Sequence, residues 1–241
     1  MRLDKFVSVC LSISRDDARK VIKNKEIYVN DKIINKISFI VNESKDIIKK
    51  DDEVLVYEEF IYLMMNKPSG YLSATVDKNK TVLDLIDEYK KYNLAIAGRL
   101  DIDTVGLLLI TNDGELIHNL TKPKANIYKK YYVEVDGKFK VGDIQLFLDG
   151  LNISDGKGNS FLTLPARLEI IDGRRAYISI KEGKFHQIKY MCKKIDLNVT
   201  YLKRLEIGPL VLDDNLKEGE YRKLENSEID LLKSFTKTRQ W

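Results

Sequence analysis

Only two cysteines and two histidines occur among the 241 residues of this sequence, and their scarcity excludes several classes of protein. Cys10 and Cys192 lie far apart, each in an apolar helical pattern, so we expect two free thiols in a reducing compartment. His118 and His186 are too few and too isolated to indicate a zinc site. Phosphate-binding glycine loops and dinucleotide motifs are also missing, which argues against nucleotide-dependent chemistry.

Long hydrophobic runs are missing as well. No run approaches the roughly 18 apolar residues that span a membrane. The first five residues are charged and lack the apolar core of a signal peptide, which predicts a cytoplasmic protein. The net charge of +4 is small, but a mildly basic chain can bind RNA where its cations cluster. The length suits one large domain and one small domain.

A polar stretch, residues 98–106, lies between two short apolar pieces, residues 94–97 and 107–110. Such pieces are typical of buried strands, so the turn between them lies at the edge of a core, where a rigid scaffold can present chemical groups. The turn is framed by glycines and contains two carboxylates, Asp101 and Asp103, with a guanidinium and a hydroxyl. This is the strongest candidate for a functional site.

Two simpler interpretations of this turn must be considered. Asp101 and Asp103 could merely satisfy backbone N–H groups, as aspartates in turns often do. A calcium loop is the second, because Asp101, Asp103 and Gly106 take the first, third and sixth positions of an EF-hand loop. Val105 stands where the fifth-position oxygen ligand belongs and Asn112 replaces the final bidentate glutamate, which excludes the calcium loop.

Residues 1–57 predict a small basic module. A helical pattern begins at Leu3, a second follows the capping residue Ser14, and a hairpin turns at Asn30-Asp31. Asn24 follows the second helix, where we expect a left-handed residue. Cations repeat on one face of that helix at i,i+4 spacing, where like charges repel unless a polyanion lies opposite. A merely solvated face is the alternative. The cations are Arg15, Arg19, Lys20 and Lys23.

The remaining residues alternate between strand and helix patterns. A strand over residues 61–65 leaves Lys67 at its end, before Pro68, and Thr81 is expected to cap a helix that runs to Tyr89. Lys129–Val135 alternates as a strand with Tyr131 on its apolar face.

Two further patterns follow in the second half of the chain. A hairpin is expected over residues 164–180 with its turn at Asp172-Gly173. The second strand leads into a helix that carries Lys189 and Tyr190.

Separate segments along the chain carry a resemblance to a known family. Gly98-Arg99-Leu100-Asp101 and the residues after it resemble the active-site motif of RNA pseudouridine synthases, most closely the branch that acts on the small ribosomal subunit. The turn at Lys67, the strand of Tyr131, the segment 182–189 and the segments 202–210 and 218–224 are similar to further motifs of that family. Residues 1–57 resemble the S4 RNA-binding domain. The resemblance implies an α+β fold, with an αα-hairpin module at 1–57 and a catalytic domain at 60–241 built on a mixed, largely antiparallel sheet flanked by helices.

The resemblance also implies roles for individual residues. Asp101 matches the essential carboxylate, Tyr131 the tyrosine that stacks on the target base, and Lys189 the cation that pairs with Asp101. Many relatives have arginine where Tyr190 stands, and His186 is interpreted as a structural hydrogen-bonding residue at a helix start. The expected RNA-binding residues are Arg2, Arg15, Arg19, Lys20, Lys23, Lys67 and Arg99.

We therefore expect an isomerase that converts one uridine of 16S ribosomal RNA to pseudouridine without a metal or cofactor. Its partner would be ribosomal RNA in an assembling small subunit, and the protein would be a monomer. One carboxylate can perform the reaction as a nucleophile or as a base, and the sequence leaves both open. Two alternatives remain: an enzyme for large-subunit (23S) ribosomal RNA, and a non-catalytic ribosome-assembly factor on the same fold.

Overall fold

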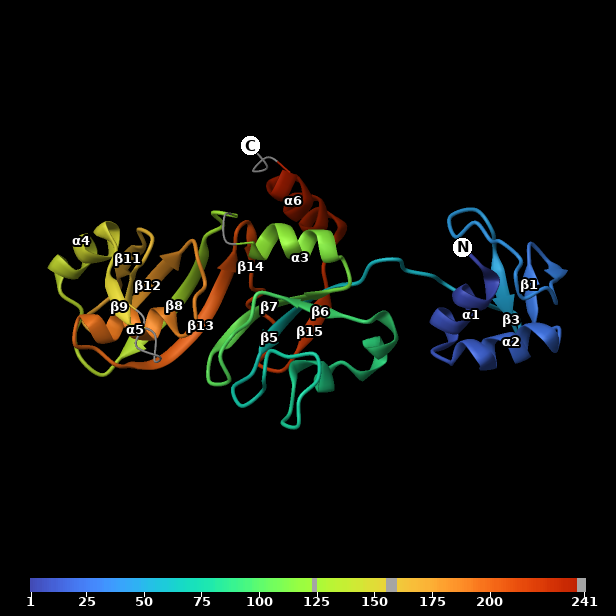
Figure 1. Ribbon diagram of the computed structural model, residues 1–241, viewed down its shortest axis with the longest axis horizontal. Coiled ribbons are helices and arrows are strands. Elements are labelled where there is room, and N and C mark those ends of the chain that lie inside the picture. Colours follow the sequence, from blue (N-terminus) through green and yellow to red (C-terminus); the bar gives the residue numbers. More distant parts are fainter. Residues whose placement is uncertain (123–124, 155–159, 238–241) are drawn as a thin grey trace. The chain divides into compact units, whose positions relative to one another are not determined.

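The computed structural model describes residues 1–122, 125–154 and 160–237 and divides the chain into two units (Figure 1). The first unit comprises Met1–Phe60 with Glu88–Asn93, and the second comprises Ile61–Asp87 with Leu94–Trp241.

The first unit is a pair of helices packed on a small antiparallel sheet. Ser14 caps the second helix, as predicted, because its side chain accepts a hydrogen bond from the Asp17 backbone N–H at 3.1 Å. The apolar faces of both helices bury Phe6, Ala18 and Ile22 against the sheet. The elements are α1 (Leu3–Leu11), α2 (Arg15–Lys23), β1 (Ile27–Val29), β2 (Lys32–Ile33), β3 (Ile48–Lys50) and β4 (Glu53–Val54), with strand order β2-β1-β3-β4.

The turn residues of this unit were predicted in part. Asn30 and Asp31 both have positive φ (49° and 63°), which confirms the two-residue hairpin turn. The prediction for Asn24 was wrong, because its φ is −71° and the left-handed residue is Lys25, at 66°. The left-handed residue is thus one position later than the sequence pattern indicated, since the Asn24 N–H still bonds to Lys20 O at 2.8 Å and Asn24 caps the helix.

The second unit is built on one mixed sheet, with strand order β11-β12-β8-β13-β7-β5-β15. Neighbouring strands pair antiparallel except β13 and β7, which run parallel at Lys203↔Val105 and Arg204↔Gly106. Two shorter strands extend it, β14 on β13 and β6 on β7. The strands are β5 (Tyr62–Lys67), β6 (Ala95–Ala97), β7 (Val105–Thr111), β8 (Lys129–Val135), β11 (Arg167–Ile170), β12 (Arg175–Ile180), β13 (Val199–Ile207), β14 (Leu210–Val211) and β15 (Tyr221–Lys223).

Helices cover this sheet, which confirms the α+β fold. The helices α3 and α6 lie together over β6 and β7 (Figure 1) and bury Leu116, Leu120 and Leu232 against that part of the sheet. A two-stranded ribbon of β9 and β10 pairs separately from the main sheet. The elements are α3 (Gly114–Thr121), α4 (Val141–Asp149), α5 (Gln187–Lys194), α6 (Asn226–Lys237), β9 (Asn152–Ser154) and β10 (Ser160–Leu162).

Two local predictions need correction. The helix expected from Thr81 to Tyr89 is instead two 3₁₀ helices, η1 (Val82–Leu85) and η2 (Asp87–Tyr92). Thr81 and Asp84 do form a capping box, but Ile86 leaves helical geometry (φ −131°) and becomes buried. The hairpin of β11 and β12 turns over four residues, 171–174, rather than two, because the Asp172 carboxylate accepts hydrogen bonds from two successive backbone N–H groups, each at 2.9 Å.

A substitution at Gly106 tests how closely β7 and β13 approach each other where they pair in parallel. Gly106 has φ +102°, and a Cβ there would lie 2.3 Å from the backbone oxygen of Arg204. We expect Gly106→Ala to lower the free energy of unfolding by about 2–4 kcal/mol, from backbone strain and separation of the two strands. Urea unfolding measures the change.

Gly142 provides the matched control. It lies in α4, and no atom stands within 4 Å of its Cβ position. Gly142→Ala should be neutral or stabilising by up to about 1 kcal/mol. Equal stability of the two variants would contradict the tight junction.

Candidate active site and basic face

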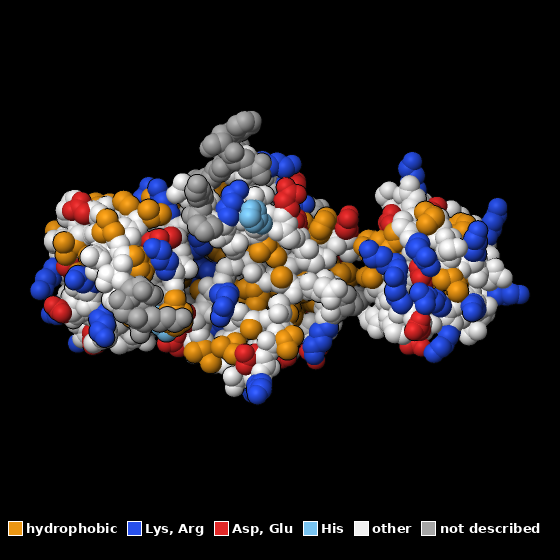
Figure 2. All heavy atoms as spheres, viewed as in Figure 1, with side chains coloured by type: hydrophobic (Ala, Val, Ile, Leu, Met, Phe, Trp, Pro, Cys, Tyr) orange, Lys and Arg blue, Asp and Glu red, His pale blue; other side chains and the backbone are white. Residues whose placement is uncertain are grey.

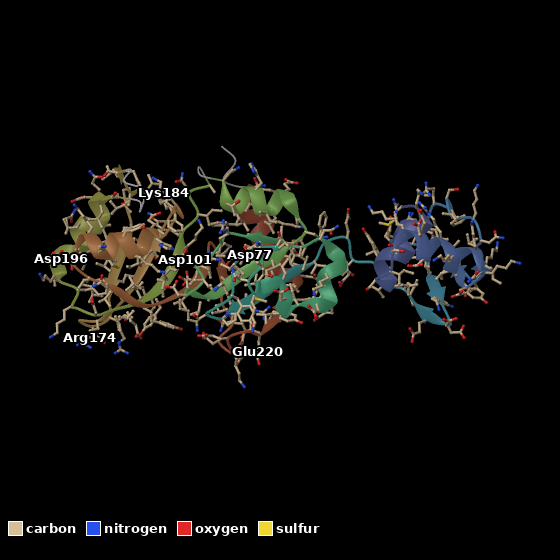
Figure 3. The ribbon with its side chains drawn as sticks, turned by 60° about the horizontal axis from the view of Figure 1, so that its bottom comes forward. Asp77, Asp101, Arg174, Lys184, Asp196 and Glu220 are labelled. Atoms are coloured by element: carbon tan, nitrogen blue, oxygen red, sulfur yellow. The ribbon has the colours of Figure 1, made fainter. Side chains whose placement is uncertain are left out.

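The turn before β7 presents Asp101 in a cleft of the second unit (Figure 3). Gly98 and Gly106 frame the turn with φ of +85° and +102°, values that L side chains rarely adopt. The side chain of Asp101 is 26% exposed. The cleft brings together the three residues predicted to be catalytic. Its lining includes Arg99, Asp101, Thr104, Tyr131, Gln187, His186 and Lys189.

The two carboxylates of the turn share one ammonium group. Lys189 Nζ lies 2.6 and 2.8 Å from the two oxygens of Asp103, but 3.5 Å from Asp101 Oδ2. Burial alone would raise the pKa of Asp103, but the hydrogen bond and charge of Lys189 outweigh it and hold the pKa below its ordinary value. The predicted Lys189–Asp101 pair therefore exists, with Asp103 as the closer partner of Lys189.

Asp101 keeps its oxygens largely free. Its second oxygen, Oδ1, lies 3.6 Å from His186 Nε2. In the described residues neither oxygen accepts a hydrogen bond within normal distance, so both retain lone pairs for a reaction. His186 does stand at the start of α5, as predicted, but its side chain makes no capping hydrogen bond and instead borders this carboxylate. The sequence pattern did not indicate that contact.

Tyr131 and Thr104 lie on the walls of the same cleft. Tyr131 points from the buried face of β8 and is 6% exposed. The Thr104 hydroxyl is buried, with no hydrogen-bond partner among the residues the structure describes. A buried hydroxyl without a partner is costly, so a polar group of a ligand in this cleft would stabilise it.

Lys67 is not a surface residue, and its prediction as an RNA contact was wrong. The side chain is fully buried at the end of β5, and Nζ donates to the backbone oxygens of Pro68, Ile102 and Thr104 at 3.0, 3.2 and 2.9 Å. Burial lowers the pKa of this ammonium group to about 8, although Asp103 and Asp101 act in the opposite direction. Lys67 holds the turn from beneath and cannot reach a phosphate.

Arg204 is a second buried cation that the sequence did not reveal. It is 1% exposed, and it donates from Nε to Leu107 O at 2.8 Å and from Nη2 to Gly98 O at 2.9 Å. These carbonyls lie on either side of the Asp101 turn, so one guanidinium joins both ends of it. The only sequence signal was a cation among the alternating residues of β13.

The first unit presents a basic face over α1 and α2, where Lys and Arg side chains gather (Figure 2). Beneath it lies Asp4, whose side chain is fully buried. Arg2 binds this carboxylate through two hydrogen bonds of 3.0 and 3.1 Å, and Arg19 Nε and Arg15 Nη2 lie 3.5 and 3.8 Å from it. Burial would raise the pKa of Asp4, but Arg2 and Arg15 outweigh it and lower the pKa.

The other basic residues of this face are exposed. Lys20 pairs with Asp17 at 2.7 Å, and Lys23 lies one turn further along α2. Three arginines thus surround one buried acid, with two lysines beside them, and Arg19 also donates from Nη1 to the exposed Asp16 at 2.8 Å.

Comparison with known proteins gives this fold and site a class. Residues 61–194 match the family model of RNA pseudouridylate synthase, and residues 1–48 match that of the S4 domain. A crystal structure of a pseudouridylate synthase superimposes with a TM-score of 0.68 at 36% identity, covering 96% of this chain and 99% of that one. The fold is therefore that of an RNA-modifying isomerase.

Curated relatives match over nearly their whole length. An RNA pseudouridine synthase of Bacillus subtilis is 40% identical over 96% of this chain and 98% of its own. Ribosomal small subunit pseudouridine synthase A of Escherichia coli is 36% identical over 95% of this chain and 98% of its own, and that of Vibrio cholerae is 37% identical over the same shares. The chain belongs to the RNA pseudouridylate synthase family and carries an N-terminal S4 domain.

None of the helices in the described residues is long and apolar enough to cross a membrane. Within the same residues, no three His, Cys, Asp or Glu side chains are grouped as metal ligands would be.

The buried position of Lys67 generates a pH prediction. Its folded-state pKa is about 8 and its ordinary value 10.5, so between these values the unfolded chain binds more protons than the native protein. The stability contributed by Lys67 is therefore smallest below pH 8 and grows as the pH rises. We expect the difference in unfolding free energy between wild type and Lys67→Met to increase in favour of wild type from pH 8 to pH 10, by up to about 1.4 kcal/mol per pH unit.

Urea unfolding at pH 7, 8, 9 and 10 measures this difference. Lys78→Met, at an exposed lysine, controls for the loss of one positive charge. A difference that stays constant across this range would contradict the depressed pKa of Lys67.

Proposed function

We propose that this enzyme converts a uridine of small-subunit (16S) ribosomal RNA to pseudouridine, with the Asp101 carboxylate as the reactive group. The observation that carries the proposal is the carboxylate itself, which stands in a cleft beside Lys189 with neither oxygen engaged in a close hydrogen bond among the described residues. The relatives named as small-subunit synthases support the choice of RNA.

The reaction breaks the bond between C1′ and N1, turns the base, and joins C1′ to C5, while N1 gains a proton and C5 loses one. The target base must first leave its stack, which costs a few kcal/mol. Tyr131, on the cleft wall, offsets part of that cost by stacking, which is worth about 1–3 kcal/mol per base. Arg99, exposed at the cleft rim, fills the space that the base leaves.

Asp101 is a better reactive group than Asp103. Both oxygens of Asp103 are hydrogen-bonded to Lys189, and its side chain is 62% exposed. Asp101 is less exposed and lies 3.5 Å from the same ammonium, where it gains electrostatic stabilisation without losing its lone pairs. Lys189 thus supports the charge on Asp101 while it anchors the neighbouring aspartate.

The S4 domain holds the RNA through its basic face, with Arg2, Arg15, Arg19, Lys20 and Lys23 on phosphates. We assign it residues 1–57 and the catalytic domain residues 60–241. The protein acts as a monomer in the cytoplasm, on the RNA of an assembling small subunit. Binding of this kind depends steeply on salt, since each phosphate contact releases counterions.

The role of Asp101 is tested by Asp101→Asn, which keeps the shape of the side chain and removes its charge. We expect pseudouridine formation to fall by about a hundredfold or more, while RNA affinity stays within severalfold. Mapping pseudouridine in a 16S transcript after incubation with each protein measures the first quantity.

Asp103→Asn is the matched control in the same turn, and we expect it to retain far more activity, because Lys189 can then approach Asp101. Comparable turnover by wild type and Asp101→Asn would contradict the assignment of Asp101 as the reactive group.

A second prediction concerns the basic face. If Asp4 orients the arginines, Asp4→Asn should weaken RNA binding severalfold even though the net charge of the protein rises by one. Arg15→Ala with Arg19→Ala should also flatten the slope of log affinity against log salt, by about 0.7–0.9 for each lost phosphate contact.

Affinity measured across a salt series separates these effects, and a thermal melt verifies that each variant is folded. Tighter RNA binding by Asp4→Asn would show that Asp4 merely repels the RNA.

A further inference from the structure

An exposed aromatic pair stands beside the reactive carboxylate and is not used in the chemistry above. The rings of Phe185 and His186 stack with centroids 3.7 Å apart and planes 19° from parallel. His186 Nε2 lies 3.6 Å from Asp101 Oδ1, whereas Phe185 is 67% exposed. A large aromatic side chain held open to solvent at the rim of a cleft leaves one ring face free for a ligand.

The turn that carries this pair is rigidly built. His186 has φ 50°, a left-handed conformation that a non-glycine residue rarely adopts. Gln187, 3% exposed, holds the turn: its Oε1 accepts from the Lys184 backbone N–H at 3.0 Å, and its Nε2 donates to Glu182 Oε1 at 2.8 Å. Glu182 also accepts a hydrogen bond from the backbone N–H of Leu164, at 2.9 Å. Strain maintained by such a buried network is typical of functional sites.

A separate groove lies further along α5. The Tyr190 ring lies 6.1 Å from that of His186, and Tyr190, Lys193 and Lys194 line the groove together with Asn152 and Ser160. Figure 3 shows α5 leading away from Asp101 towards Asp196, the residue labelled just beyond its end. In the described part of the chain, neither Lys193 nor Lys194 has a carboxylate within 4.0 Å.

We propose that the Phe185–His186 pair and the Tyr190–Lys193–Lys194 face of α5 form a subsite for the single-stranded RNA that flanks the target uridine. This inference rests on the proposed reaction at Asp101. The neighbouring base stacks on Phe185, and the following phosphates lie against the two lysines. Aromatic rings alternating with cations are the arrangement that binds single strands with little sequence preference. Tyr190, rather than arginine, then supplies a second stacking surface within the groove.

The test uses the full-length protein and an RNA of about 20 nucleotides centred on the modified uridine mapped in 16S RNA. 2-Aminopurine replaces the base on the 5′ or the 3′ side of that uridine, and its fluorescence is followed with Asp101→Asn protein, so that no turnover intervenes. We expect quenching on one side of the target, lost in Phe185→Ala and retained in Phe185→Tyr. Affinity should fall about 5- to 150-fold in Phe185→Ala, the range that corresponds to losing one stacked base worth about 1–3 kcal/mol.

Salt dependence tests the lysines. Lys193→Ala with Lys194→Ala should flatten the salt slope by about 1.4, for two single-strand phosphates at about 0.7 each. Lys217→Ala with Lys237→Ala, which removes two exposed lysines elsewhere in this unit, should leave the slope unchanged.

Unchanged quenching and affinity in Phe185→Ala would overturn the subsite. So would a Phe185→Ala enzyme that fails only on assembled subunits and not on naked RNA, since the pair would then contact a protein. If the wild-type enzyme forms no pseudouridine in 16S RNA, the proposed function fails. In that case the fluorescence comparison, made on a single-stranded oligouridine with one 2-aminopurine, still decides whether Phe185 stacks on RNA.

Discussion

The site depends on the buried guanidinium of Arg204, which binds the backbone on both sides of the Asp101 turn. Its hydrogen bonds to Gly98 O and Leu107 O connect the two ends of that turn, and at the same point β13 pairs in parallel with β7. Gly106 allows this approach, because its Cβ position is already occupied by the backbone of Arg204. A buried charge is costly unless it is hydrogen-bonded, and removing one partner leaves polar groups orphaned. The geometry of the turn is therefore fixed by the strand that crosses behind it.

The electrostatic arrangement around the turn follows from the same buried cations. Burial lowers the pKa values of Lys67 and Lys129 to about 8, and the charge of Arg204 acts in the same direction on both. Asp101 and Asp103 oppose this shift at Lys67, so the carboxylates lie within electrostatic reach of the buried ammonium. With Lys189 on the open side, the two acids are placed between cations. Because Lys67 and Arg204 are held by the packing of the sheet, the charges around Asp101 depend on that packing.

Much of this was predictable from the sequence, and the failures have specific causes. The glycine-framed turn and the alternating strand of Tyr131 are local signals, and the structure brings Asp101, Tyr131 and Lys189 into one cleft. Lys67 was misassigned because a strand-end lysine looks exposed until the carbonyls of Ile102 and Thr104 close around it. Contacts made across so many residues leave no local pattern. The role of Arg204 was not predicted for the same reason, because its hydrogen-bond partners come from other segments of the chain. The 3₁₀ turns after Thr81 reflect burial of Ile86, a tertiary effect that overrides helix propensity.

In each of the two units a buried charged residue lies beneath side chains of the opposite charge, and the signs are reversed between the units. In the S4 domain a buried acid, Asp4, lies within 3.8 Å of three exposed arginines of the basic face, and in the catalytic domain buried cations lie behind the carboxylates of the cleft. An exposed ion pair contributes little to stability, because solvent screens it and long side chains lose entropy in forming it. A buried counter-ion with several partners loses less conformational entropy in forming these pairs, because packing already fixes its side chain. It can therefore orient flexible surface groups in the free protein. Substitutions at these buried ions should alter function more than their distance from the RNA would suggest.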